Sequence, residues 1–519
     1  MRNETRKKPE RPKYADEFNQ SHGLAQKKNL SKERSKSIGE NPLKQRNKLH
    51  ACLIVLGDFM HSPRMQNHAL ELIKCGFYVT VISYTSRDRD RNDDQNSSSE
   101  AISSTSSKKA KREKKLLSEN LRFVRVQKME RMRFVPNVLY FMVRIIAQFW
   151  QCLVCLVFEQ GGRGRYSYVM TQCPPGMPTF MACAVYKRFF NEECTFVIDW
   201  HNLGYSLFAL GRKRGEKDFL VRVMKVYERV FLKHADEHIA VTAKMKEFLC
   251  NEWAVDERKC LVLRDAPSAQ FLKLNKKQTR EKKRGFRRKT PNVVNVVSST
   301  SWTPDEDFDV LLAAVVLYDK LATSNKKTNK KEKLPFLNIL ITGKGALRES
   351  FERRAEEAKL KSVSFSYAWL PINEYPERLA MSDVGLCLHQ SSSKLDLPMK
   401  IVDMFGVGIP VIARRYPCLS EELVEENVNG VTFETSEELC DVLVNILKGW
   451  NGEENGTKAL QNLERGVWRE NLKVFGDYSN NNSNNNDDDD DDDNFVDFWE
   501  ENWNDKARFI FISDKNAED

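Results

Sequence analysis

The sequence lacks the patterns that mark several protein classes. Its 12 cysteines form no paired CxxC motifs and have no histidine partners at zinc spacing, which excludes a zinc-finger framework and indicates a reducing compartment. No internal repeat is visible, so a solenoid is excluded and a globular body is expected. The first 50 residues contain no apolar signal-peptide core, so we expect no secretory leader.

Neither sign of charge dominates strongly. The chain has 83 Lys and Arg against 73 Asp and Glu, a net charge of +10. Basic runs at 108–115, 275–289 and 326–333 interrupt the hydrophobic pattern, which predicts solvated loops, with attraction to an anionic membrane surface as the alternative. Aromatic residues do not alternate with basic ones in these runs, so we expect no nucleic-acid partner.

Long hydrophobic runs are also scarce. The best membrane candidate is 134–159, but its uninterrupted apolar part after Arg144 is only 14 residues long, shorter than the roughly 20 needed to cross a bilayer. We expect a helix packed on a sheet, with a helix lying in the membrane interface as the alternative.

What the chain does contain is an alternation of apolar strands and amphipathic helices, the pattern of βαβ units. Its 519 residues are too many for one compact core, which favours two domains. The pattern therefore predicts an α/β protein with two Rossmann-like, doubly wound domains facing a cleft. The expected strands are 51–57, 77–83, 166–172, 195–200, 237–242 and 260–264 in the first domain, and 292–298, 336–342, 363–367, 384–388 and 409–413 in the second.

Composition also predicts the domain boundaries. We expect a disordered basic tail (1–48), a first domain (49–272) with a disordered insertion (86–119), a basic linker (273–290), a second domain (291–476), an Asn/Asp-rich loop (477–493) and a Trp-rich terminal helix (494–512) that returns to the body.

Four loops that follow predicted strands could carry chemistry. They are "GDFMHSPRMQ" (57–66), "VIDWHNLGYS" (197–206), "TGKGALRE" (342–349) and the stretch 389–413. The first and third lead into helix N-termini, which suit an anion, although an ordinary capped turn explains the first equally well. In the second, His201 is a candidate general base, with a structural histidine as the alternative.

The fourth loop places charges at helical spacing. Pro398 is suited to begin a helix that ends near Gly406. On that helix Lys400 and Asp403 share a face away from the apolar side, and Asp396 stands just before it. A cation beside a helix N-terminus suits a leaving diphosphate and a carboxylate suits ribose hydroxyls, whereas a Lys–Asp pair on a solvated face is the structural alternative.

Together these motifs resemble a known family. "VLGDFMHSPRMQNHAL", "QCPPGMPT", "VIDWHNLGYS", "VSSTSWTPDEDFDVLLAA", "ITGKGALRE", "SDVGLCLHQSSSKLDLPMKIVDMFGVGIPV" and "NGVTFETSEEL" are similar to the ordered motifs of the chitobiosyldiphosphodolichol β-mannosyltransferases, glycosyltransferase family 33. The similarity spans about residues 51–445 and reaches "WEENW" near the C-terminus.

The resemblance implies a GT-B fold and an inverting transfer of the first β1,4-linked mannose from GDP-mannose to GlcNAc₂-diphosphodolichol for protein N-glycosylation. It implies a location at the cytosolic face of the endoplasmic reticulum membrane, contact with the membrane surface and room for complexes with other lipid-linked oligosaccharide mannosyltransferases. No cofactor is firmly implied, and dependence on a divalent metal is left open.

The resemblance also implies roles for individual residues. Donor-side candidates are Ser299, Thr300, Ser301, Gly343, Lys344, Gly345, Asp396, Leu397, Lys400 and Asp403. Acceptor-side candidates are Ser62, Arg64, Asp199 and Asn202. The candidate catalytic residues are His201 as the base, Asp58 as the alternative base, and Lys400 as the group that stabilises departing GDP.

The chain departs from the family pattern at several places. Met60 and His61 stand where Gly-Arg is usual, Lys394 stands where Gly is usual, and Ala266 replaces a long polar side chain. A basic polar tail replaces the usual N-terminal membrane anchor. Two alternatives therefore accompany the enzyme hypothesis, namely a catalytically silent nucleotide-sugar-binding partner of the same pathway and a related GT-B transferase with another donor.

Overall fold

The computed structural model describes residues 49–84, 115–131, 135–160, 164–267, 269–272, 276–324, 333–371, 374–452, 456–475 and 498–512. Residues 49–519 belong to one compact unit. The predicted tail (1–48), the Asn/Asp-rich loop (477–493) and most of the predicted insertion (86–119) lie outside the described residues.

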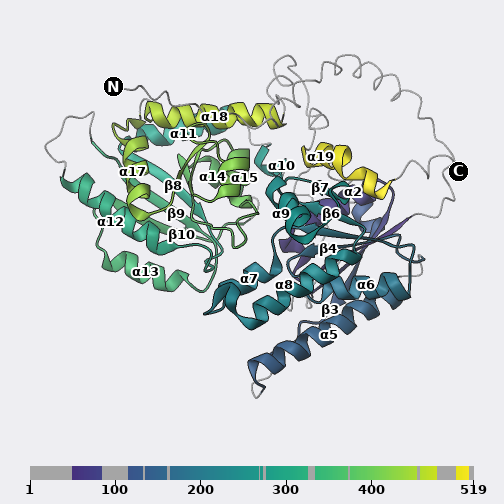
Figure 1. Cartoon of the computed structure of the whole chain (residues 1–519). Helices are drawn as coiled ribbons and strands as arrows, with labels where there is room; N and C mark the ends of the chain where they lie inside the picture. Colours follow the sequence, from purple (N-terminus) through teal and green to yellow (C-terminus); the bar gives the residue numbers. More distant parts are fainter. Residues whose placement is uncertain are drawn as a thin grey trace, which may run out of the picture. The chain divides into compact units, whose positions relative to one another are not determined.

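The first sheet is parallel and has the strand order β3-β2-β1-β4-β5-β6-β7 (Figure 1). The chain builds outward from β1 to β3 and then returns to place β4 on the other side of β1, so the order reverses between β1 and β4, where ligands usually bind in such sheets. Its strands are β1 (His50–Val55), β2 (Tyr78–Tyr84), β3 (Leu121–Val126), β4 (Tyr168–Cys173), β5 (Thr195–Trp200), β6 (Glu237–Ala240) and β7 (Cys260–Val262).

The second sheet repeats this plan with the order β10-β9-β8-β11-β12-β13. It is also parallel, and its order reverses between β8 and β11. Its strands are β8 (Val293–Ser299), β9 (Phe336–Thr342), β10 (Val363–Ala368), β11 (Val384–Cys387), β12 (Val411–Arg414) and β13 (Gly430–Phe433). The prediction of two Rossmann-like doubly wound domains is confirmed, whereas the exact domain boundaries stay predictions.

Helices cover both faces of each sheet, as the crossover connections require. Those of the first half are α2 (Pro63–Lys74), α5 (Asn137–Phe158), α6 (Thr179–Phe189), α7 (Gly204–Leu210), α8 (Phe219–Phe231) and α9 (Ala243–Trp253). Next in the chain come α10 (Ala269–Leu272), whose Phe271 packs in a core cluster of the second half, and α11 (Lys276–Lys289). Those of the second half are α12 (Phe308–Ser324), α13 (Arg348–Glu357), α14 (Tyr375–Ala380), α15 (Met399–Gly406), α16 (Pro417–Glu422), α17 (Ser436–Leu447) and α18 (Lys458–Phe475).

The sequence missed two strands. β3 is partly exposed and contains two arginines, so it lacks the apolar run that reveals a buried strand. β13 has only four residues. A partly exposed strand and a strand of only four residues both lack an apolar run long enough to be recognised.

The basic run 275–289 was predicted to be a solvated loop, and this is wrong for most of it, whereas the linker at 273–290 stays a prediction. Residues Lys276–Lys289 form α11. Arg287 is buried and pairs with Asp383 and Glu464, and Lys283 also pairs with Glu464. Basic residues at helical spacing thus anchor this segment to the second sheet through acidic partners distant in sequence.

The helix α5 is longer than the apolar run suggested. It has 22 residues, and Val138–Phe158 is long and apolar enough to cross a membrane by length and composition alone. Cys152, Leu153 and Leu156 on one side are buried in the core of the first sheet, which confirms the predicted packing on a sheet. Its other side is exposed.

The Trp-rich C-terminal segment returns to the first sheet, as predicted, but as two helices in place of one. These are α19 (Phe498–Lys506) and α20 (Arg508–Phe511). Trp499, Trp503 and Phe511 are buried in the same core cluster as residues of β1 and α2. The aromatic side chains of the terminus therefore complete the face of the sheet that α5 does not cover.

Candidate active site

A buried ion pair connects the start of a helix to the end of a strand in the first half. Arg64 lies in the first turn of α2, which follows β1, and Asp199 lies near the end of β5. The Arg64 guanidinium donates three hydrogen bonds of 2.9–3.1 Å to the Asp199 carboxylate. It also donates to the Asp265 carboxylate and to the carbonyl of Leu263. Such two-pronged pairing fixes both position and orientation.

His201 extends this network to the surface. Its Nε2 lies 2.7 Å from Asp199 Oδ2, while a quarter of its side chain remains exposed. Burial alone would raise the pKa of Asp199, but the Arg64 guanidinium and the His201 ring lower it well below its usual value. Asp199 is therefore a carboxylate that accepts the Nε2 proton, which leaves Nδ1 of His201 as the nitrogen able to accept a proton.

A second histidine lies on the inner side of Asp199. His68 Nδ1 accepts a hydrogen bond from Trp503 Nε1 at 3.0 Å, and its Nε2 lies 3.4 Å from Asp199 Oδ2. Burial lowers the pKa of His68, which keeps the ring neutral. The terminal helix α19 thus supports the network, a contact that the sequence analysis missed because 435 positions separate the two residues.

The other candidates near the first sheet have different surroundings. Asp58 caps a short turn: its Oδ1 accepts from the Met60 amide and its Oδ2 lies 3.1 Å from His61 Nδ1. Ser62 occupies the N-cap position of α2, but its hydroxyl donates to Gln172 in place of capping.

The predicted acceptor residues therefore differ in access. Arg64 and Asp199 are 5% and 0% exposed and bind each other, so neither side chain offers surface to an acceptor. Asn202 is buried as well, and its side-chain amide donates to Ser392 Oγ at 3.3 Å. Beside Asp199 and Asn202 in this loop, His201 keeps a quarter of its side chain exposed.

At the second sheet, one carboxylate gathers several predicted donor-side residues. Glu306 Oε2 accepts hydrogen bonds from the Ser301 amide and from the Thr300 hydroxyl. Its Oε1 is paired with the Lys400 ammonium on α15. Glu306 is buried, whereas Lys400 is about one-quarter exposed. The structure thus brings Thr300, Ser301 and Lys400 together through a residue that the sequence analysis missed.

A signal for Glu306 was present in the sequence. It lies in "TPDEDFD", just before α12, where acidic residues often serve as helix caps. Asp307 is the one that meets this expectation, since its Oδ1 accepts from the Asp309 and Val310 amides. Glu306 could not be distinguished from the neighbouring acidic residues, which looked like helix caps.

The glycine loop after β9 packs against the loop after β8. Gly343 has φ of +130°, and a Cβ there would lie 1.8 Å from the Thr300 carbonyl oxygen. A Cβ on Gly345 would lie 2.3 Å from the Ser301 carbonyl oxygen. Both positions therefore require glycine for close backbone approach. Lys344 between them lies over the ring of Trp369 at 4.6 Å.

The serine-rich loop after β11 holds a charged triad. His389 Nδ1 lies 2.8 Å from Asp305 Oδ2, and its Nε2 lies 3.8 Å from Asp396 Oδ2. Burial alone would lower the pKa of His389, but the two carboxylates raise it to about 9. His389 is therefore a cation at neutral pH. Asp396 also accepts hydrogen bonds from Ser391 and Ser393.

The helix α15 has the predicted form. It begins after Pro398 and ends at Gly406. Ile401, Val402, Met404 and Phe405 are buried, whereas Lys400 and Asp403 are only half-buried. Burial and the charge of Asp265 raise the pKa of Asp403 to about 8. Leu397, just before the helix, packs against the apolar cluster behind it.

Lys394 adopts a left-handed backbone conformation, with φ of +63°. Glycine occupies this region without steric cost, whereas a residue with a Cβ is strained there. The glycine that the family pattern has at this position therefore matches the backbone geometry, and Lys394 is a strained exception.

Hydrogen bonds join the loops of the two sheets. Ser392 Oγ accepts from Asn202 and lies 2.8 Å from Ser206 Oγ. The Thr242 hydroxyl donates to the Leu395 carbonyl. The His201 loop and the loop before Asp396 are thus in direct contact.

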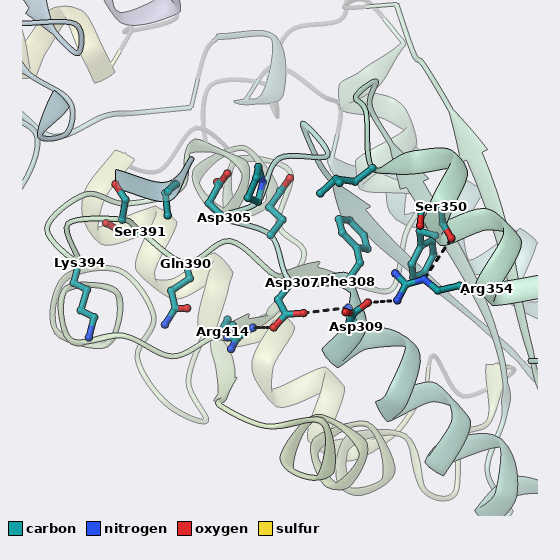
Figure 2. Close-up of a pocket in the computed structure, with 16 residues that line it drawn as sticks. Asp305, Asp307, Phe308, Asp309, Ser350, Arg354, Gln390, Ser391, Lys394 and Arg414 are labelled. Carbon is teal, nitrogen blue, oxygen red and sulfur yellow. Dashed lines mark hydrogen bonds and ion pairs between the residues drawn. The ribbon is translucent and has the colours of Figure 1, made fainter. Parts of the chain in front are cut away.

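A cavity of about 500 Å³ opens beside these loops (Figure 2). Asp305, Glu306, Ser391 and Lys394 line it, but none of the predicted donor-side residues does. Ion pairs between Arg414 and Asp307 and between Arg354 and Asp309 neutralise much of its wall. This cavity therefore lies beside the predicted donor-side residues and is not formed by them.

Within the described ranges, no group of three or more His, Cys, Asp or Glu side chains is arranged to hold a metal ion. All 12 cysteines are free thiols.

Comparison with known proteins places this arrangement in a family. Residues 279–461 match the family model "Glycosyl transferases group 1". The chitobiosyldiphosphodolichol beta-mannosyltransferase of Debaryomyces hansenii is 33% identical over 487 residues, covering 89% of this chain and 88% of that protein. The UDP-glycosyltransferase TURAN of Arabidopsis thaliana is 31% identical and covers 80% of this chain and 92% of its own.

A solved structure supports the fold. The sucrose-phosphate synthase of Thermosynechococcus elongatus superposes with a TM-score of 0.52 at 13% identity, covering 82% of this chain and 98% of its own. The 33% identity to the Debaryomyces hansenii protein, which extends over 88% of its length, is stronger evidence than this structural similarity. It agrees with the ordered motifs and the two doubly wound sheets. The chain belongs to the chitobiosyldiphosphodolichol beta-mannosyltransferase family.

Proposed function

We propose that the protein transfers mannose from GDP-mannose to GlcNAc₂-diphosphodolichol, forming a β1,4 linkage with inversion at the sugar C1. Family membership supports the reaction. The observation in this chain that carries the proposal is the Lys400 ammonium, which Glu306 holds beside Thr300 and Ser301 at the ends of β8 and β11. Strand ends at such a reversal are where nucleotides bind in doubly wound sheets.

Lys400 would stabilise the departing diphosphate. When the bond between mannose C1 and GDP breaks, negative charge grows on the diphosphate oxygens, and a fixed cation nearby lowers the energy of that state. The protonated His389 offsets part of the negative charge of Asp305 and Asp396 in the adjoining loop. The glycine loop at Gly343–Gly345 brings its backbone close to the carbonyl oxygens of Thr300 and Ser301, and Asp403 would accept the ribose hydroxyls.

His201 is the base that the geometry favours over Asp58. Asp199 fixes the His201 ring through Nε2, which leaves Nδ1 to take the proton of the acceptor hydroxyl as its oxygen bonds to mannose C1. Both carboxylate oxygens of Asp58 are engaged in its own turn. Arg64 and Asp199 would act by positioning His201, and Ser62 and Asn202 would line the acceptor side.

We further propose that the protein works on the cytosolic face of the endoplasmic reticulum, with the exposed side of α5 in the membrane interface. A dolichol-linked substrate requires contact with a bilayer. The exposed row on α5 supports this placement, since it includes Val138, Met142, Ile146, Trp150 and Phe158, and apolar side chains of this size are unfavourable in water.

The experiment is an in vitro transfer assay with radiolabelled GDP-mannose and a GlcNAc₂-diphospho-lipid that carries a short, soluble chain. We expect turnover, a loss of about 10²–10³ in kcat for Lys400→Ala, and a loss of about 10²–10⁴ for His201→Asn. Lys361→Ala, an exposed lysine in the same half, serves as the control and should leave kcat unchanged.

Two other results would replace the proposal. GDP-mannose binding without turnover would make the protein a silent nucleotide-sugar-binding partner. Displacement of bound GDP-mannose by a UDP-sugar, with transfer of that sugar, would assign another donor. The second outcome is included because the Arabidopsis relative is named a UDP-glycosyltransferase.

A further inference from the structure

The outer side of α8 carries an exposed face that the reaction does not use. We call this the α8 outer face. It consists of Phe219, Arg222, Val223, Val226, Arg229 and Val230 of the helix and of Lys233 in the short turn that follows. All seven are exposed. Spaced at intervals of three and four, they occupy one side of the helix.

The opposite side of α8 faces the core. Val221, Met224 and Glu228 are buried there, and Val221 and Met224 belong to the same core cluster as the inner residues of α5 and α6. The α8 outer face therefore points away from the sheet. Phe219 is 75% exposed and Val226 is 61% exposed, so packing within the described part of the chain does not cover them.

The charges on this face all have one sign. Arg222, Arg229 and Lys233 alternate with the apolar residues, and Glu228 is the one acidic residue between 219 and 233. Because Glu228 is buried, no negative charge of the helix reaches the outer surface. Apolar side chains mixed with cations alone suit a surface that is apolar inside and anionic at its boundary.

The α8 outer face adjoins the exposed apolar side of α5. Helix α6 packs against both α5 and α8 (Figure 1), and Phe141 of α5 stacks on Phe208 of α7 with ring centroids 5.4 Å apart. Phe189, at the end of α6, is also largely exposed. Helices α5, α6 and α8 thus pack in sequence, with exposed apolar side chains on α5 and apolar side chains mixed with cations on α8.

We propose that the α8 outer face is a second membrane-docking element, which binds the interface of a bilayer containing anionic phospholipids while α5 supplies the purely apolar contact. The proposal rests on the proposed function only in that the substrate is held in a membrane. A second copy of the chain is a poor occupant, because pairing this face with itself would bring like charges together. Two helices on one surface would also fix the tilt of the first sheet, and thus of the His201 loop, relative to the membrane.

The test is flotation of the purified full chain with vesicles of phosphatidylcholine alone or with about 30% phosphatidylserine. We expect Phe219→Ser/Val226→Ser to weaken binding to the anionic vesicles at least tenfold, since it removes the most exposed apolar area. We expect Arg222→Gln/Arg229→Gln/Lys233→Gln to weaken binding by about fivefold per cation and to remove most of its salt dependence.

Matched controls are available elsewhere on the chain. Phe509→Ser removes a phenylalanine that is 60% exposed on α20, and Arg353→Gln/Lys359→Gln/Lys361→Gln removes three exposed cations near α13. Both controls should float like the wild type. Circular dichroism melts should be unchanged for all variants, because every substituted side chain is exposed.

Transfer assays separate this proposal from the proposed function. The α8 variants should keep wild-type kcat on a short-chain soluble acceptor and lose activity on a long-chain acceptor embedded in anionic vesicles. Absence of turnover by the wild type would refute the proposed function and leave flotation as a valid test of docking. The docking proposal would be overturned if both α8 variants floated like the wild type. It would also be overturned if the variants floated normally but no longer bound a protein that the wild type binds, because α8 would then be a protein-binding surface.

Discussion

The two sheets hold their site loops by different means. At the first sheet, charged side chains fix the loop, since Arg64, Asp199 and His201 are linked by hydrogen bonds in a mostly buried network. At the second sheet, the backbone at Gly343 and Gly345 lies so close to the carbonyl oxygens of Thr300 and Ser301 that a Cβ would overlap them. Glu306 connects these loops to Lys400. In the proposed function, the first arrangement orients the ring of a base, whereas the second places a cation beside the departing diphosphate.

This comparison predicts that the site loop of the first sheet is sensitive to the loss of a charge. Arg64→Met would leave Asp199 as a buried carboxylate without its main partner, and breaking such a pair costs about 3–5 kcal/mol. We expect a decrease of that size in the free energy of unfolding, measured by urea denaturation. Arg258→Met is the control, because Arg258 pairs with Asp256 in solvent and its loss should change stability by less than about 1 kcal/mol. Equal effects of the two variants would show that the buried pair does not hold the loop.

Substitution of a glycine should damage the second half through its backbone. In Gly343→Ala the new Cβ would overlap the Thr300 carbonyl oxygen, so the two loops must separate. A displacement of about 1 Å at a site can cost on the order of 10² in rate, and we expect that loss in kcat/KM for the nucleotide sugar. Gly285→Ala in α11 has no atom within 4 Å of the new Cβ and should leave kcat/KM unchanged. A normal kcat/KM for Gly343→Ala would mean that these loops do not shape the donor site.

The third prediction concerns Glu228, which lies buried behind the His201 loop. Burial raises the pKa of Glu228 to about 8, although the amides of Tyr205 and Gly204 act in the opposite direction. The titratable groups that face it are Cys173, Tyr205 and Tyr227, and these supply no positive charge at neutral pH.

The sign of the pH effect follows from proton binding. The unfolded chain releases the Glu228 proton near pH 4.5, whereas the folded protein keeps it up to about pH 8. The folded state therefore binds one more proton in this range, and its stability falls as pH rises by about 1.4 kcal/mol per pH unit. Between pH 6 and 7.5 this amounts to about 2 kcal/mol.

Glu228→Gln should remove this slope, since an amide does not titrate. The difference in unfolding free energy between wild type and variant, measured by urea denaturation from pH 5 to 8, isolates the contribution of this one group. The exposed Glu257→Gln is the control and should run parallel to the wild type. A wild-type slope that Glu228→Gln leaves intact would show that Glu228 is ionised in the folded protein.

Much of the site's framework was predictable because its signals are local. The apolar run before Asp199 and His201 predicted a strand end, and Pro398 together with the buried positions up to Phe405 predicted α15. The positions of Lys400 and Asp403 on its less buried side followed from helical spacing alone. The roles of the candidate residues stay predictions, to be tested by the substitutions above.

The remainder could not be predicted because the partners are distant in the chain. Glu306 meets Lys400 across 94 positions, and Trp503 meets His68 across 435. The resemblance implied that Arg64 binds the acceptor, since a basic residue at a helix start gives no sign of the buried Asp199 and the partly exposed Asp265 that bind it.

The sequence by itself determined the alternation of strands and helices, the two sheets and the family, because hydrophobic periodicity and ordered motifs are properties of neighbouring residues. Tertiary structure alone decided which polar groups are neutralised inside the protein and which face outward. Arg64 and Asp199 are buried and pair with each other, whereas His201 and Lys400 remain partly exposed. Tertiary structure also leaves the cations and valines of α8 on the surface, because burial depends on what the rest of the chain brings against each face.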